Sequence, residues 1–242
     1  MQRRNVLISL LLSAAPIAGA QQRSATSPEQ YVVGRTPILI PPPTGFVETS
    51  RRAPELWRAA SLVPQAGGVL VVAHFVPDAD IKALESGKTV TARQYMLVQL
   101  PRAAEHAIAT EAQFNTLRSG TTAMQRNLAA QLEPQLAAAL AKISGGQSAG
   151  QTPEVRLSVG EMVPVSIDRD ESNLLVYTLL AKVSRTESGA TVHIPTVSTL
   201  AYCFTKGKIF MLAGYREFNS PRDIQASRNA IMSWARATLN VN

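Results

Sequence analysis

The sequence has 242 residues, of which 45% are hydrophobic and 17% are charged, and its formal net charge is +7. A chain of this length and composition forms one globular domain, or at most two small ones, around a buried core. The basic residues are scattered rather than gathered with aromatic side chains, which argues against nucleic-acid binding. The moderate positive charge favours association with acidic ligands or acidic envelope surfaces.

The N-terminus has the pattern of a secretory signal peptide. The pair Arg3-Arg4 precedes the apolar run Val6–Ala20, whose last three residues are small, and this predicts cleavage before Gln21. The run is shorter than the roughly 20 residues of a membrane-spanning helix. General secretion is the favoured route, and the paired arginines leave twin-arginine export open. We expect residues 1–20 to be removed and the mature protein to be periplasmic or secreted.

The remaining chain is expected to contain a polar leading segment and one domain. Residues 21–35 lack an apolar pattern, which predicts a flexible N-terminal segment. The three prolines Pro41–Pro43 then force an extended path. We expect residues 36–242 to form a single α/β domain in which residues 145–152 form a Gly/Ser loop.

The first half of the domain is expected to alternate short helices with strands. Residues 52–61 can form a short helix, and the apolar run Val69–Val76 predicts a strand that is buried on both faces. Asp78 is expected to cap a second short helix that continues to Leu84. A second strand is predicted over Val90–Leu100.

A long Ala-rich helical region is expected from about Ala103 to Ile143, with an interruption at Gly120. Five apolar residues recur in it at four-residue intervals: Met124, Leu128, Leu132, Leu136 and Leu140. Such a stripe predicts contact with the core. Pro134 lies inside the stripe and must kink the helix or begin a new one. The alternative use of residues 124–140 is binding to a membrane surface or to a partner helix.

The last third predicts strands and one C-terminal helix. Two strands, Val155–Ile167 and Leu174–Val183, are joined by a charged turn, and a hairpin follows them. A two-residue turn at Lys206-Gly207 pairs Cys203 with Phe210 and Tyr202 with Met211. Both faces of this hairpin are apolar, so we expect helices to cover both faces of the sheet.

The C-terminal helix is marked by its first residues. Ser220 is expected at the N-cap, Pro221 at the first helical position and Asp223 three residues after the cap. Apolar residues line one face of this helix: Ile224, Ile231, Met232, Ala235 and Leu239, with Trp234 at the edge. Arg228 falls within the stripe, where we expect its stem to lie along the apolar surface.

Residues Gly146–Gly150 match the G-x-S-x-G pattern of a serine-hydrolase nucleophile elbow, with Ser148 as the nucleophile. Asp168, Asp170 and His193 follow in the chain order of the α/β-hydrolases. The motif requires a strand before the serine and a helix after it, whereas here a helix precedes Ser148 and a strand follows. We therefore interpret the segment as a linker, and a serine hydrolase that uses Ser148 is kept as an alternative.

Cys203 is the single cysteine of the chain, so it cannot form an internal disulfide. Its expected neighbours in the hairpin are apolar, whereas a reactive thiol needs an electropositive, partly exposed site. Packing of Cys203 in the core is therefore favoured over catalysis or intermolecular pairing.

No metal site, cofactor or catalytic residue is expected. The histidines His74, His106 and His193 do not have the short spacing of a zinc motif, and convergence in space is left open. Asp168, Asp170 and Asn173 hint at calcium. An EF-hand loop needs Gly at its sixth position and Glu at its twelfth, where this sequence has Asn173 and Leu179. A solvated turn is therefore favoured.

Three features resemble the Mog1/PsbP-like domains. They are the extended approach that contains Pro43, Gly45 and Phe46, the hairpin AYCFTKGKIFMLAGY, and a helix that ends in WARATLNVN. The resemblance spans Thr36 to Asn242, with the long Ala-rich region as an elaboration. It implies an α+β fold in which a largely antiparallel sheet is layered with helices as an α-β-α sandwich. It also implies a non-catalytic accessory or binding domain, and no functional residue carries over.

The sequence thus predicts an exported, non-enzymatic accessory or binding protein. Its expected partner is an unidentified protein or an acidic envelope ligand. The alternatives are a small exported serine hydrolase that uses Ser148, and a peripheral membrane protein that binds through residues 124–140.

Overall fold

The computed structural model describes residues 28–66, 68–91, 93–144, 156–187 and 190–242. The predicted signal peptide and the Gly/Ser loop that contains Ser148 lie outside these ranges.

The fold is built on one seven-stranded sheet in which the strand order is β3-β4-β5-β9-β8-β7-β6 and every neighbouring pair is antiparallel. Its strands are β3 Phe46–Glu48, β4 Val69–Pro77, β5 Gln94–Pro101, β6 Arg156–Glu171, β7 Leu174–Glu187, β8 Ala190–Thr205 and β9 Lys208–Glu217. A separate hairpin consists of β1 Glu29–Val33 and β2 Thr36–Ile40. The helices are α1 Thr49–Arg52, α2 Pro54–Ala66, α3 Asp78–Glu85, α4 Glu111–Ser144 and α5 Pro221–Asn240, with a short 3-10 helix at Arg102–Ala104.

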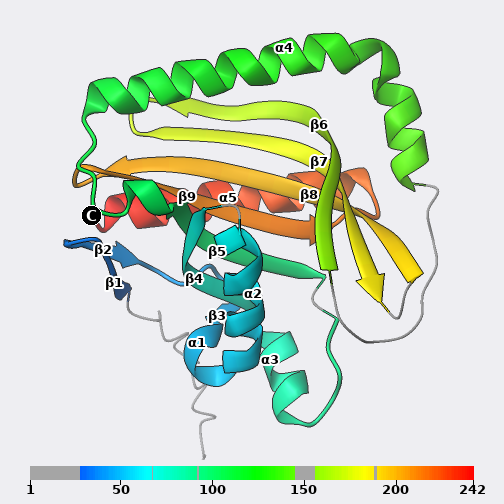
Figure 1. The fold of residues 1–242 in the computed structure, drawn as a ribbon, viewed down its shortest axis with the longest axis horizontal. Coiled ribbons are helices and arrows are strands. Elements are labelled where there is room, and N and C mark those ends of the chain that lie inside the picture. The colour runs from blue at the N-terminus through cyan, green and yellow to red at the C-terminus, as the bar shows by residue number, and fades with distance from the viewer. Residues whose placement is uncertain (1–27, 67, 92, 145–155, 188–189) are drawn as a thin grey trace, which may run out of the picture.

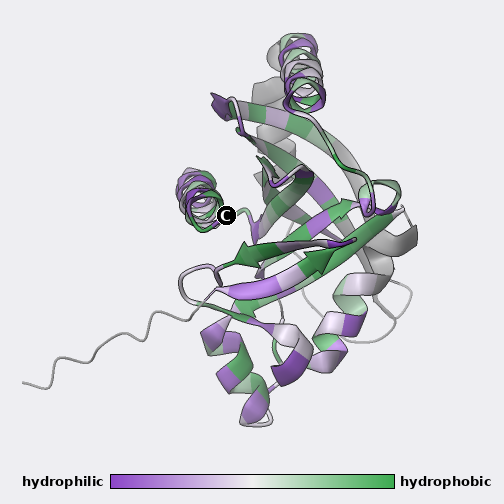
Figure 2. Cartoon of the chain, turned by 90° about the vertical axis from the view of Figure 1, so that its left-hand side faces the viewer, coloured by the Kyte–Doolittle hydropathy of each residue, from purple (hydrophilic) through white to green (hydrophobic). Residues whose placement is uncertain are grey.

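The helices lie on both faces of the sheet and along one of its edges. In Figure 1, α5 lies behind the sheet, α2 lies in front of it, and α4 runs beside the edge strand β6. Figure 2, turned by 90°, shows α4 and α5 nearly end-on and well separated. This mixed α+β arrangement, with helices against both faces of an antiparallel sheet, confirms the fold class expected from the sequence.

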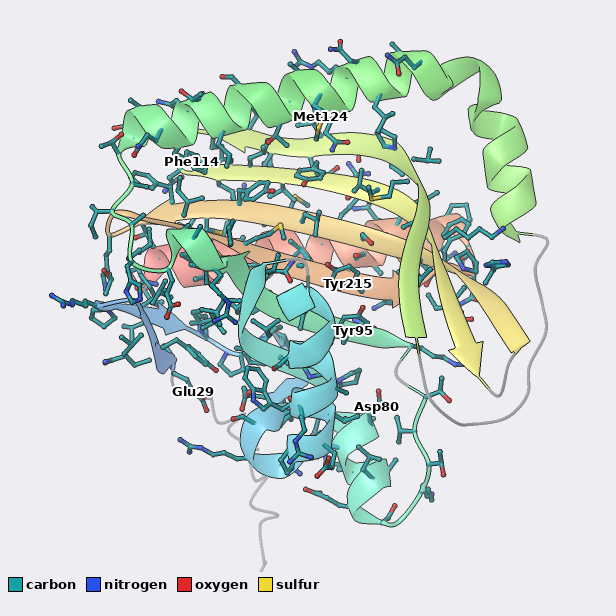
Figure 3. The ribbon with its side chains drawn as sticks, viewed as in Figure 1. Glu29, Asp80, Tyr95, Phe114, Met124 and Tyr215 are labelled. Carbon is teal, nitrogen blue, oxygen red and sulfur yellow. The ribbon has the colours of Figure 1, made fainter. Side chains whose placement is uncertain are left out.

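The main core lies between α5 and the sheet. Ile231, Trp234 and Ala235 of α5 pack against Phe75, Met96 and other buried residues of the central strands. On the opposite face, Trp57 of α2 packs against a smaller cluster that includes Leu97. Tyr95 and Tyr215, labelled in Figure 3, belong to this second face and stack with their ring centroids 4.8 Å apart.

Local chemistry accounts for the elements that agree with the sequence. Cys203 pairs with Phe210 and Tyr202 with Met211, as predicted. The turn residues Lys206 and Gly207 have φ of 49° and 70°, the left-handed pair that a two-residue hairpin requires.

The start of α5 also agrees with the sequence. Ser220 and Asp223 form the predicted capping box, with Pro221 at the beginning of the helix.

The N-terminal segment expected to be flexible up to Arg35 contains strand β1, which pairs with β2 over its whole length. Gly34 makes the turn between them with φ 64° and lies so close to the backbone of Glu105 that a Cβ would meet its carbonyl oxygen at 2.3 Å. The side-chain amide of Asn242 also bonds the backbone of Leu39, so the far end of the chain holds this hairpin in place.

Several helix boundaries differ from the expectation, and the short helix expected over residues 52–61 lies at Pro54–Ala66. Asp78 is the first residue of α3 rather than its cap, because Pro77 takes the cap position and the Asp78 carboxylate pairs with Lys82 and Arg52. The long helix begins at Glu111 rather than near Ala103, and it continues without interruption through Gly120.

The start of the long helix is set by Thr110. Its hydroxyl accepts from the backbone of Gln113, and the Gln113 side chain accepts in return from the backbone of Thr110. This reciprocal pair is a capping box, and it places the start of the helix eight residues later than expected.

The expectation that the Met124–Leu140 stripe contacts the core is wrong at its first member. Met124, labelled in Figure 3, is 55% exposed, whereas Phe114, Thr122 and Gln125 are buried on the inner face of α4. An α-helix advances about 100° per residue, so residues four apart drift by about 40° at each step. A repeat of four therefore winds around the helix instead of marking one face. The helix passes through Pro134 as one element, and Figure 1 shows it bending before its end.

Candidate functional site

A cavity of about 300 Å³ lies where the proline-rich segment before β3 meets helix α5. Its lining comes from that segment, from the centre of the sheet and from α5: Pro42, Pro43, Thr44, Met96, Asn229, Ala230, Ser233, Trp234 and Ala237. Asn229, Ser233 and Ala237 are spaced four residues apart on α5 and are exposed to solvent. The cavity therefore opens along one side of this helix.

The walls of the cavity are fixed by contacts that follow from the residue types. The Trp234 indole N–H donates to the carbonyl of Pro41 at 2.7 Å, and the Trp234 ring meets Phe75 edge to face. The backbone N–H of Phe46 donates to the Pro43 carbonyl at 3.0 Å, which closes the turn below the prolines. Because proline fixes φ, this wall has little conformational freedom to lose when a ligand binds.

The lining offers mainly apolar contact and a few hydrogen-bonding groups. None of the lining residues has a titratable side chain, and the polar groups are limited to Thr44, Asn229 and Ser233. A largely apolar cavity of a few hundred Å³ with a small number of polar groups is the usual form of a ligand site.

The two carboxylates considered for a catalytic triad or a calcium loop are both engaged by arginines. Asp168 is almost fully buried, with its side chain 1% exposed, and pairs with Arg228 of α5 at 2.5 Å. Asp170 pairs with Arg118 of α4 at 2.5 Å. The expectation of a solvated turn is therefore wrong for Asp168, which lies in strand β6. Arg228 likewise forms an ion pair instead of only lying along apolar surface.

Asp168 is the centre of a polar network that ties α5 to the sheet. Its carboxylate accepts from Ser166 at 2.7 Å and from Thr178 at 2.6 Å. The Thr178 hydroxyl contacts Thr199 at 3.2 Å, and Thr199 contacts Ser227 of α5 at 2.9 Å. These donors satisfy the buried carboxylate, so its role is structural.

Sheet register separates Asp170 from His193. Asp170 lies opposite Leu175, and Leu175 lies opposite Tyr202 on β8. His193 is nine residues away on β8, which corresponds to about 30 Å along a strand. These two residues cannot belong to one triad, and Ser148 lies outside the described residues.

Cys203 is fully buried beside the carbonyl of Ala201, as predicted. Burial raises the pKa of its thiol above the usual range, which suppresses the reactive thiolate. Cys203 is therefore a core residue.

The three histidines lie in different surroundings. His74 is buried on β4, where Nδ1 lies 2.9 Å from the Thr49 hydroxyl, and burial lowers its pKa to about 4. His106 is exposed next to Gly34, and His193 lies opposite Ser184 on the sheet. Within the described residues, no group of three or more His, Cys, Asp or Glu side chains could hold a metal ion.

Sequence reasoning did not find the cavity, because its lining has no motif and is assembled from three separate segments. Two of its residues were named for other reasons: Pro43 as part of an extended path, and Trp234 at the edge of the apolar face of the last helix. Three consecutive prolines together with a tryptophan on the last helix were the available signal. Neither feature indicates by itself that the two segments meet.

The architecture is an α+β sandwich in which helices lie on both faces of a largely antiparallel sheet. The solution structure of cyanobacterial PsbP (CyanoP) from Synechocystis sp. PCC 6803 is similar to this chain at 12% sequence identity. The similarity covers 90% of this chain and 97% of that one, with a TM-score of 0.32. It transfers no residue, partner or activity to this protein. No family model matches the chain, and no curated protein matches it.

Proposed function

We propose that this protein is an exported, non-enzymatic binding protein that takes an apolar ligand group into the cavity between Pro42–Thr44 and α5. The observation that carries the proposal is the lining itself, which is mostly apolar and has no titratable side chain. A volume of about 300 Å³ is at the lower end of the range for ligand sites, so the group that enters is small.

The engagement of the reactive side chains also supports binding rather than catalysis. Cys203 is buried among apolar residues, and Asp168 and Asp170 are held by arginines, so these reactive groups serve the fold.

Among the helices of the described residues, none is long and apolar enough to cross a membrane. Export rests on the signal-peptide pattern, and mass spectrometry of the protein recovered from the periplasm should find Gln21 as its first residue.

The cavity can be tested with the fluorescence of Trp234. The chain has two tryptophans, so Trp57→Phe leaves Trp234 as the only one, in the cavity wall. The uncharged dye N-phenyl-1-naphthylamine brightens in apolar surroundings and accepts energy from tryptophan. We expect it to quench Trp234 emission saturably, with dye emission rising in parallel.

A matched pair of α5 variants controls for non-specific binding. Ser233→Phe places a bulky side chain at the cavity and should weaken dye binding by about tenfold or more, since the ring occupies the same apolar space. Gln225→Phe adds the same ring at another exposed position on α5 that does not line the cavity, and should bind the dye as the parent does. Unsaturable quenching, or equal binding by both variants, would contradict the proposal.

A further inference from the structure

A second cavity, of about 370 Å³, lies between helix α4 and the end of strand β6. It is lined by Arg126 of α4 and by five consecutive residues of β6, Ile167–Glu171. Unlike the cavity at α5, its lining is almost entirely charged. It is formed by the same part of β6 that carries Asp168 and Asp170.

Each carboxylate in this cavity already has an arginine that comes from outside the lining. Arg118 pairs with Asp170 and Arg228 with Asp168, both at 2.5 Å, and Arg236 lies 3.9 Å from Glu171. The negative charge of the lining is therefore compensated before its own arginines are considered.

The positive charges of the two arginines that line the cavity are not neutralised by its carboxylates. Among the described residues, Arg169 reaches only Glu171, at 4.0 Å, which is long for an ion pair. Arg126 is exposed and forms no ion pair or hydrogen bond with the described residues. Around this cavity, five arginines thus surround three carboxylates, an excess of two positive charges.

We infer that this cavity is an anion site that binds a phosphate group between Arg126 and Arg169. A guanidinium presents a planar set of donors that matches phosphate oxygens, and such charge-assisted bonds are among the strongest polar contacts. The site uses none of the residues that line the cavity at α5. Either proposal can fail without the other.

The direct test is an NMR titration of the ¹⁵N-labelled protein with inorganic phosphate, with sodium chloride adjusted to hold the ionic strength constant. We expect saturable shifts in the amides of residues 126 and 167–171. The double variant Arg126→Gln/Arg169→Gln should lower phosphate affinity by at least about tenfold, because it removes both charged donors.

The control is the double variant Arg102→Gln/Arg222→Gln, which removes the same charge at two exposed positions that do not line the cavity. It should bind phosphate within about twofold of wild type. Absence of saturable shifts, or equal loss in both double variants, overturns the inference, because the attraction would then reflect only net charge. The Ser233→Phe variant should bind phosphate as wild type does.

A second experiment, with lipid vesicles, identifies the source of the phosphate group. Co-sedimentation with mixed phosphatidylglycerol and phosphatidylcholine vesicles, lost in Arg126→Gln/Arg169→Gln and retained in the control, would assign the site to an anionic lipid headgroup. A phosphate titration that succeeds without such co-sedimentation would assign it to a soluble phosphate compound.

Discussion

Helices α4 and α5 both lie against the sheet, but they contact it through faces of opposite character. Helix α5 buries Ile231, Trp234 and Ala235 in the main core. The described part of α4 buries Phe114 and then turns Thr122 and Gln125 inward. Within the described residues, buried oxygens of these last two side chains have no hydrogen-bond partner, and the same holds for the Thr238 hydroxyl of α5. A buried polar atom without a partner costs roughly 1–3 kcal/mol on either helix, so the difference in stabilisation comes from the apolar side chains that α5 places in the main core.

The difference indicates separate roles for the two helices. Edge strand β6 is 16 residues long, and an unprotected edge of that length can pair with other chains. Three register irregularities interrupt its ladder with β7, and α4 runs beside it in Figure 1. We interpret α5 as the helix that stabilises the fold and α4 as the helix that shields an edge.

The largest change in the free energy of unfolding should come from shortening a side chain on the face of α5 that packs in the core. Ile231 is fully buried and lies so close to Gly214 that a Cβ there would meet its side chain at 2.8 Å. Ile231→Ala should lower the free energy of unfolding by about 3 kcal/mol, because the backbone cannot collapse into the space left. Urea denaturation followed by circular dichroism measures this change.

The matched change on α4 is Met124→Ala, at a side chain that is mostly exposed. It should change the free energy of unfolding by no more than about 0.5 kcal/mol. Similar losses in Ile231→Ala and Met124→Ala would remove the distinction between the helices.

The second effect concerns His74, which lies on the face opposite α5. Burial lowers its pKa from 6.5 to about 4 in the folded protein. Between these values the unfolded chain binds a proton that the folded chain does not, so stability falls as the pH drops from 6.5 toward 4. The full loss is about 3 kcal/mol and is absent above pH 6.5.

Urea denaturation between pH 7.5 and pH 4 tests this dependence. His74→Gln should reduce the loss of stability across that window relative to wild type, whatever its effect at pH 7.5. His106→Gln, at an exposed histidine, should retain the wild-type dependence. If the His74 variant keeps the full dependence, burial of this imidazole is not its cause.

The sequence predicted the parts of the fold that are decided locally. The hairpin register of Cys203 follows from a two-residue turn, and the start of α5 follows from the spacing of Ser220 and Asp223. The inner face of α4 could not be predicted in this way, because it depends on the edge of a sheet formed by residues that come later in the chain. The pairing of Arg228 with Asp168 depends equally on tertiary contact.

The candidate cavity was beyond sequence reasoning for a related reason. Its proline-rich wall and its helical wall are nearly 200 residues apart, and they meet through one hydrogen bond, from Trp234 to the carbonyl of Pro41. Every residue has a backbone carbonyl, so the sequence does not indicate which one accepts this hydrogen bond. The sequence therefore predicted the two walls as separate elements and not the space between them.

The smallest change in the free energy of unfolding should come from the inner face of α4, and it should be an increase. Thr122→Val combined with Gln125→Leu removes two buried polar atoms that lack partners within the described residues and replaces them with apolar groups of similar size. The double variant should raise the free energy of unfolding by about 1 kcal/mol, because those atoms no longer lose their hydration on folding. Asn127→Leu, at an exposed position of the same helix, should leave it within about 0.5 kcal/mol of wild type. Hydrogen exchange should slow along α4 in the double variant alone. A loss of stability in that variant would mean that ordered water satisfies these atoms and that α4 is held as firmly as α5.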